Sequence, residues 1–139
     1  MILTKFDEPQ EYHAPGQETR RARMFIDEDK IGREDIVVGM SIYGPGMEAP
    51  FHAHKGSETM FIVHGRGQFG TREKAVEAGP GDVLYFTPAE EHFLRNIGSQ
   101  TLEFVFIYSQ PGDERPVKDK WVPIAKYDSH DCTGSRRRQ

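Results

Sequence analysis

The stretch that decides the fold is Gly46-Met-Glu-Ala-Pro-Phe-His52-Ala-His54-Lys-Gly-Ser-Glu58, followed by Gly65. In a β-strand, residues i and i+2 lie on one face, so His52 and His54 are predicted to point into the same space. The Lys-Gly-Ser segment after them lets the chain turn, and Glu58 is expected to open the next strand, facing the first. Two imidazoles and a carboxylate at one point suit Fe, Mn, Ni, Cu or Zn better than Ca or Mg.

A fourth candidate ligand, His92, lies in a second stretch that also begins at a glycine. Gly81-Asp leads into an apolar strand, then into a turn that contains Pro88, and then to His92 and Asn96. A lone histidine in a strand is more often a surface or hydrogen-bonded core residue than a ligand. Four coordinating side chains in two such stretches are much harder to explain in that way.

Together the two stretches resemble the two motifs of the cupin family. The first cupin motif reads Gly, five residues, His-x-His, three or four residues, Glu, six residues, Gly, and the stretch from Gly46 to Gly65 matches it without a gap. In the second motif Gly81 and His92 keep the cupin spacing. The resemblance covers residues 36–110. It implies the metal ligands His52, His54, Glu58 and His92 and one divalent metal ion.

The second stretch departs from the cupin pattern at its turn. Pro88 comes one position late, and Ala89 and Glu90 stand in place of the internal glycine. This departure affects the geometry of the turn and leaves the ligand in place.

Composition limits the partners. The chain has 139 residues, which corresponds to one ordinary domain, and its net charge of −4 gives no case for a nucleic-acid partner. The basic run at residues 135–139 is expected to be a solvated tail.

The start of the chain lacks a signal-peptide pattern, and no apolar run approaches the ~20 residues of a membrane span. A single cysteine, Cys132, excludes an internal disulfide. A cytoplasmic protein without a membrane partner is predicted.

Short β-branched and aromatic runs separated by Gly and Pro predict an all-β sandwich or barrel, because no convincing helix precedes residue 110. The cupin resemblance narrows this to a small double-sheet jelly roll.

We divide the chain into an N-terminal arm with short strands (1–35), the barrel (36–110) and a C-terminal extension with a polar basic tail (111–139). The apolar segment 121–124 is expected to pack back on the barrel or on a partner subunit. The strands are expected at 24–26, 36–43, 52–54, 58–64, 66–72, 74–78, 82–86, 92–96 and 101–109.

Side-chain parity suggests the wall of a pocket beside the metal. Met60 and His64 share the face of Glu58, although His64 has a surface role near the following turn as its alternative. Asn96 is expected to satisfy backbone groups. For each aromatic candidate, simple core packing is the alternative, and a one-residue slip in register would exchange the two faces. The remaining wall candidates are Met40, Tyr43, Tyr85, Phe104 and Phe106.

Three histidines and one glutamate would leave one or two open positions on a metal, which suits Lewis-acid chemistry, activation of water or O₂ chemistry at ferrous iron. The cupin family includes dioxygenases, decarboxylases, isomerases, cyclases, lyases and non-catalytic binding proteins, so the fold does not choose a reaction. We expect an enzyme that acts on a small substrate with chelating oxygens, a dioxygenase first. The alternatives are a redox-neutral cyclase, isomerase or decarboxylase, and a non-catalytic small-ligand or metal-binding module.

A homodimer is also expected. Small cupins commonly dimerise, and the N-terminal arm could add a strand to the sheet edge of a neighbouring subunit.

Overall fold

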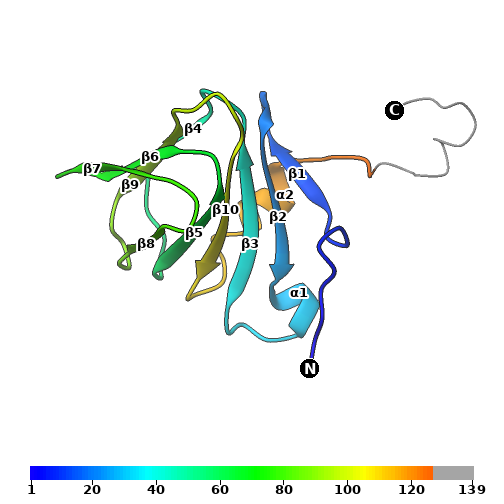
Figure 1. The fold of residues 1–139 in the computed structure, drawn as a ribbon. Coiled ribbons are helices and arrows are strands. Elements are labelled where there is room, and N and C mark those ends of the chain that lie inside the picture. Colours follow the sequence, from blue (N-terminus) through cyan, green and yellow to red (C-terminus); the bar gives the residue numbers. More distant parts are fainter. Residues whose placement is uncertain (127–139) are drawn as a thin grey trace, which may run out of the picture.

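The computed structural model describes residues 1–126 and shows two antiparallel sheets that face each other (Figure 1). The larger sheet has the strand order β11-β1-β2-β3-β10-β5-β8, and the smaller has the order β4-β9-β6-β7. The strands are β1 (Glu11–Ala14), β2 (Gln17–Ile26), β3 (Val37–Tyr43), β4 (Glu48–His52), β5 (Glu58–His64), β6 (Gly67–Thr71), β7 (Ala75–Ala78), β8 (Val83–Phe86), β9 (His92–Asn96), β10 (Leu102–Tyr108) and β11 (Val122–Pro123).

The eight strands β3 to β10 form the jelly roll that was predicted. Four of them, in the order β3-β10-β5-β8, face the other four, in the order β4-β9-β6-β7, and every neighbouring pair is antiparallel. Leu102, Phe104 and Phe106 alternate with half-exposed residues along β10 and are buried between the sheets. This confirms an all-β, double-sheet fold whose core lies between the two layers.

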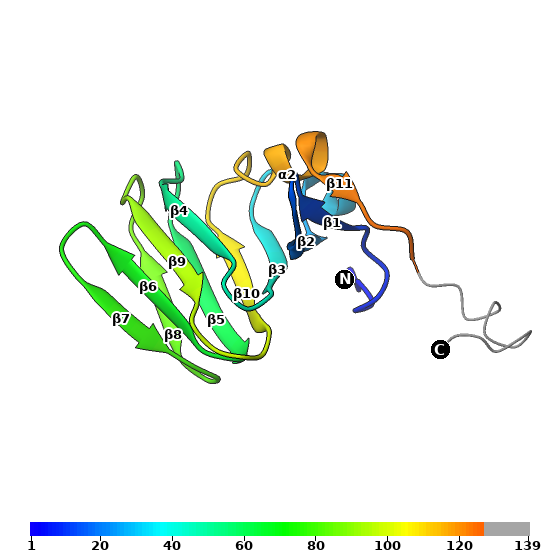
Figure 2. The same cartoon turned by 90° about the horizontal axis from the view of Figure 1, so that it is seen from above.

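The N-terminal segment is more regular than its sequence indicated. Strand β2 has ten residues and pairs along β3, while β1 pairs with both β2 and β11. These strands therefore extend the larger sheet of their own chain, as Figures 1 and 2 show, so the N-terminal arm is not left unpaired within its own chain. Pro15 and Gly16 interrupt the sequence pattern only because they make the turn between β1 and β2.

Two short helices complete the fold. Helix α1 (Glu28–Ile31) follows β2, where the charged run 27–30 indicated a turn: Asp27 caps it by accepting a hydrogen bond from the Lys30 amide, and Gly32 ends it at φ 71°. Helix α2 (Arg115–Lys120) follows the barrel, and β11 then returns the chain to β1. The segment 121–124 thus packs back on its own chain. Neither helix in residues 1–126 has the length and apolar character of a membrane span.

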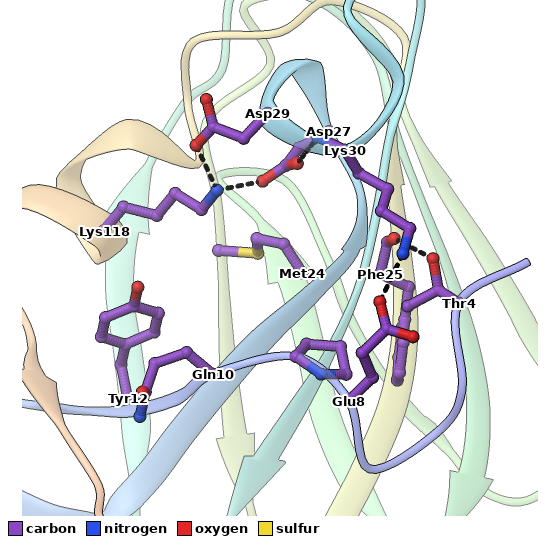
Figure 3. Close-up of a pocket in the computed structure, with 11 residues that line it drawn as sticks. Thr4, Glu8, Gln10, Tyr12, Met24, Phe25, Asp27, Asp29, Lys30 and Lys118 are labelled. Carbon is purple, nitrogen blue, oxygen red and sulfur yellow. Dashed lines mark hydrogen bonds and ion pairs between the residues drawn. The ribbon is translucent and has the colours of Figure 1, made fainter. Parts of the chain in front are cut away.

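Ion pairs hold α2 against α1. Lys118 contacts Asp27, which is buried, and lies 2.7 Å from Asp29, as Figure 3 shows. Arg115 adds a bond of 3.0 Å to Glu28. These contacts join the C-terminal extension to the start of the β2–β3 connection, and so they fix where α2 lies relative to the larger sheet. The expected basic tail and Cys132 lie outside the described residues.

Two turns carry the positive-φ positions that the barrel needs. Gly65 has φ 81°, and a Cβ atom there would lie 2.2 Å from the Thr101 carbonyl oxygen, so only glycine fits. Ala89 has φ 65°, where the cupin pattern has its internal glycine. Its amide donates to the His54 carbonyl oxygen at 2.9 Å. The turn before β9 therefore keeps a left-handed residue without a glycine.

We predict that Ala89→Gly stabilises the protein. A left-handed conformation costs a residue with a Cβ about 1–2 kcal/mol, and part of that gain is offset by the greater entropy of glycine in the unfolded chain. The free energy of unfolding should rise by about 0.5–1 kcal/mol in urea titrations. Ala75→Gly, on an exposed edge strand, should instead lower it by a similar amount. A loss of stability in the Ala89→Gly protein would contradict this account of the turn.

Candidate metal centre

Four side chains converge between the two sheets at the end where β5 begins and β9 begins. One ligand atom from each of His52, His54, Glu58 and His92 lies within 4.8 Å of the others. His52 ends β4, Glu58 starts β5 and His92 starts β9, where His92 is the cross-strand partner of His52. The expected strand 52–54 is not formed, because β4 stops at His52 and the turn that follows brings His54 into the cluster.

Backbone carbonyls orient two of the imidazole rings. Nδ1 of His52 lies 2.7 Å from the Pro50 carbonyl oxygen, and Nδ1 of His92 lies 2.9 Å from the Glu90 carbonyl oxygen. Each Nδ1 therefore carries the proton that it donates, so Nε2 is the ring atom left to bind a metal ion. This is the tautomer that a metal ligand requires, and it is set by the chain's own turns.

A carboxylate lies beside each nitrogen of the His54 ring. Its Nδ1 lies 3.6 Å from Oδ2 of Asp113, and its Nε2 lies 3.0 Å from Oε1 of Glu58. The second approach has no hydrogen-bond geometry, so the buried Nε2 of His54 has no hydrogen-bond partner. A buried polar atom without a partner is unfavourable, and a metal ion shared with Glu58 would satisfy it. The residues present therefore fit a bound divalent ion.

Burial and charge oppose each other at Glu58. The residue is only 3% exposed, which by itself raises the pKa of its carboxyl, but the His54 and His92 imidazoles, whose Nε2 atoms lie 3.0 and 3.1 Å from Oε1, together outweigh burial and hold that pKa below its ordinary value. Burial likewise lowers the pKa of His54, and Glu58 and Asp113 together more than reverse this. Burial dominates at His52 and lowers its pKa, which keeps that imidazole neutral. A negative carboxylate facing imidazoles is the electrostatic environment that attracts a cation.

Aromatic side chains pack on the cluster from two sides. Phe86 stacks on the His92 ring with 4.1 Å between centroids and 11° between planes, and Tyr108 lies 4.7 Å from the His54 ring. Burial and the charge of Glu58 raise the pKa of Tyr108 well above its ordinary value, so that its hydroxyl stays protonated. These rings restrict rotation of the imidazoles and exclude water from their faces.

A cavity of about 230 Å³ adjoins the centre and is lined by His52, His54 and Glu58. Its wall contains four of the predicted residues, namely Tyr43, Met60, Phe104 and Phe106. Gly39 allows this arrangement, because a Cβ there would lie 2.3 Å from the Phe106 ring. The prediction that Asn96 serves the backbone is confirmed: its amide donates to the Tyr43 and Gln100 carbonyl oxygens.

Three of the predicted wall residues do not line this cavity. Met40 is buried on the outer face of the sheet between its cross-strand partners Arg23 and Val105. Tyr85 is 61% exposed, because Leu84 and Phe86 are the residues of β8 that point inward. These two placements correct the register assumed for β3 and β8.

His64 also points away from the centre. A register shift in the β5–β10 pairing falls between Ile62 and His64, and the exposed His64 ring bonds the Thr101 carbonyl oxygen at 2.8 Å. The shift ends the alternation that placed His64 on the face of Glu58. Its role is at the turn.

Sequence reasoning missed several lining residues. Tyr108 shares the face of Phe104 and Phe106 on β10, and Leu94 shares the face of His92 on β9, so parity could have found both. Arg20, Asp113 and Trp121 come from segments outside the barrel, and no local pattern marks them. They reach the cavity because β2 extends the sheet and α2 covers its inner face.

The fold and the four converging donors define a jelly-roll protein with a centre suited to one divalent metal ion. The sequence profile of the family described as "Cupin domain" matches residues 39–108. The chain belongs to the cupin family.

Similar proteins include enzymes and binding proteins. The chain is 34% identical over 64 residues to the oxalate-binding protein of Thermotoga maritima, covering 45% of this chain and 53% of the relative. It is 35% identical over 60 residues to the (R)-mandelonitrile lyase of Granulicella tundricola, covering 42% and 46%. It is 21% identical over 99 residues to auxin-binding protein 1 of Arabidopsis thaliana, covering 65% and 50%. The chain thus spans about half the length of these relatives.

Solved structures share the fold at lower identity. A predicted oxalate decarboxylase of Thermotoga maritima superposes with a TM-score of 0.67 at 21% identity, covering 79% of this chain and all of the other. A variant of the oxalate decarboxylase of Bacillus subtilis superposes with a TM-score of 0.66 at 18% identity, covering 79% and 29%.

We predict that His54→Ala removes most of the bound metal and leaves the β fold intact. The substitution removes one of four donors, while the core between the sheets stays apolar. Metal content after dialysis, measured by inductively coupled plasma mass spectrometry, should fall at least tenfold. In the wild type, donors should surround the ion at about 2.0–2.3 Å. His64→Ala is the matched control and should keep its metal; equal metal content in the two variants would refute the assignment.

Proposed function

We propose that this chain is a divalent-metal-dependent enzyme that acts on a small organic substrate with chelating oxygens. The observation that carries the proposal is the cavity beside the four donors. A structural metal site is closed by its protein ligands, whereas a catalytic site keeps room for a substrate next to the ion. Here the donors stand at the edge of a cavity of about 230 Å³ rather than in a filled shell.

Each residue has a distinct role in this proposal. The three imidazoles and Glu58 would hold the ion, and Asp113 would keep His54 in the binding tautomer. The ion would supply Lewis-acid polarisation of a substrate oxygen or, as ferrous iron, chemistry with O₂. Burial raises the pKa of Tyr43, so its hydroxyl stays protonated and can donate a hydrogen bond to a substrate oxygen. Val117 and Trp121 cover the cavity from α2 and its C-terminal end.

An iron-dependent dioxygenase is the first reaction class we propose. Redox-neutral chemistry is the second, and it is favoured by the names of two similar proteins, a lyase and an oxalate decarboxylase. The alternative to an enzyme is a non-catalytic module that binds a small ligand or a metal. It is favoured by the two relatives that are described as binding proteins.

Metal exchange separates these classes. We expect protein loaded with Fe²⁺ to consume O₂ in the presence of a member of a panel of β-diketones, α-hydroxy ketones and α-hydroxy acids, and to bind nitric oxide. Zinc-loaded wild type and iron-treated His54→Ala should do neither, because the first lacks a redox-active ion and the second lacks a ligand. Product formation with zinc or manganese and no O₂ uptake would replace the dioxygenase by the redox-neutral class. Saturable binding without turnover under any metal would favour the binding module.

We also propose a homodimer. Its support is an apolar patch on the outer face of the larger sheet, where Phe61 and Val83 are cross-strand partners and are 47% and 62% exposed. Tyr85 and Val63 continue this patch on the same two strands. Such a patch on adjacent strands is a frequent mark of a protein interface.

We predict that light scattering after size exclusion gives twice the mass of 15.9 kDa for the wild type. Phe61→Lys should shift the protein to the monomer, since it places a charge in the patch. Gln68→Lys, on the other sheet, should not. A wild-type monomer at micromolar concentration would contradict the proposal.

A further inference from the structure

Arg20 brings a cation to the wall of the cavity beside the metal centre. It lies on β2 as the cross-strand partner of Tyr43, and its Nε donates to the Tyr43 hydroxyl at 3.2 Å. Its Nη1 donates to Gln17 at 3.2 Å. No carboxylate in residues 1–126 forms an ion pair with Arg20, whereas its neighbour Arg21 pairs with Glu11. Arg20 is half-buried, so its charge is neither neutralised nor fully hydrated.

Two aromatic rings frame the Arg20 guanidinium. The Tyr43 ring centroid lies 5.4 Å from it and the Trp121 centroid 5.2 Å. Cation–π contacts on two sides restrict the movement of the planar group. A guanidinium has five N–H donors, and the two bonds to Tyr43 and Gln17 leave others free. A planar, oriented donor group with an unpaired charge is suited to a carboxylate, which it can bind through two parallel hydrogen bonds.

The charges of the cavity wall also favour one added negative charge. Two carboxylates line the cavity, Glu58 at the centre and Asp113 beside His54. The ligand imidazoles bind a metal in their neutral form, so they add no charge. The positive charge of a bound divalent ion and Arg20 together exceeds the negative charge of the two carboxylates by one. A monoanion would therefore leave the filled cavity electrically neutral.

Apart from Ser41, the wall between Arg20 and the metal centre is apolar. Met60, Leu94, Phe104 and Phe106 line it, and Tyr43 bridges its two ends: its hydroxyl bonds Arg20 and lies within the field of Glu58. Apolar walls with few convergent polar groups are typical of sites that bind organic ligands. The two polar ends would thus orient a ligand whose middle is a hydrocarbon chain or ring.

We propose that the substrate is an organic monoanion whose carboxylate binds Arg20, whose apolar body lies along this wall and whose oxygen donors at the other end face the metal centre. The inference rests on the proposed function for the metal end only. It makes Arg20 a specificity-determining residue that selects carboxylates over neutral analogues of the same shape. It also disfavours very short diacids, which lack a body to span the two ends.

The test uses 4,6-dioxoheptanoate, a β-diketone with a carboxylate at its far end, and its primary amide. Isothermal titration calorimetry on full-length, manganese-loaded protein should show the acid binding about tenfold to a hundredfold more tightly than the amide. Trp121 is the chain's sole tryptophan and lies beside Arg20, so its fluorescence should respond to the acid. Arg20→Gln should reduce the affinity for the acid to that for the amide and leave the amide unchanged. Arg20→Lys should retain part of the preference.

Arg21→Gln is the matched control, because Arg21 is the next residue on the same strand and faces the opposite side. It should keep the full preference for the acid. Equal affinities of acid and amide for the wild type, no binding of the acid, or an undiminished preference in Arg20→Gln would each overturn the proposal. Metal-free wild type should bind the acid more weakly and still prefer it over the amide. The acid–amide comparison can therefore be interpreted even if the protein shows no catalysis. A failed comparison, in turn, does not affect the outcome of the metal-content and metal-exchange experiments.

Discussion

Glu58 brings a carboxylate into a mainly apolar interior between the two sheets, and the centre is organised around that charge. An unpaired charge at this depth would cost several kcal/mol, so the surroundings must supply positive partners. His54 and His92 do so within 3.0 and 3.1 Å. In the absence of metal they can meet this need only by sharing protons, whereas a divalent ion meets it directly and releases those protons. Metal affinity and the stability of the interior are therefore linked through one side chain.

The geometry of the centre originates in the backbone. Carbonyl oxygens of Pro50 and Glu90 fix two imidazoles, and the Ala89 amide fixes the backbone at His54. The turn 87–90 therefore positions two ligands: the Glu90 carbonyl oxygen orients the His92 ring, and the Ala89 amide holds the His54 backbone. This explains why the chain keeps a left-handed residue there although it lacks the usual glycine. The shape of the turn is what the centre requires, and alanine can supply it at a cost in conformational energy.

Sequence spacing predicted the parts of the site that depend on short-range geometry. The strands at 58–64 and 92–96 begin at ligands, and alternation along β10 placed Phe104 and Phe106 inside. Alternation was misapplied on β3, where Met40 and Tyr43 are three residues apart and must face opposite sides. Arg20 and Trp121 could not be predicted, because their contact depends on how the C-terminal extension folds over the face of β2 that carries Arg20.

The residues that line the cavity come partly from the region that matches the cupin profile and partly from segments outside it. The metal-binding donors fall within residues 39–108, the region that matches the cupin profile. Three lining residues lie outside that region: Arg20 on β2, and Asp113 and Trp121 in the C-terminal extension. Relatedness over the shared region therefore carries information about the metal-binding donors and very little about the rest of the cavity wall. Exchanging the two flanking segments between members of the family would change the charged and aromatic rim of the cavity around an unchanged set of metal-binding donors.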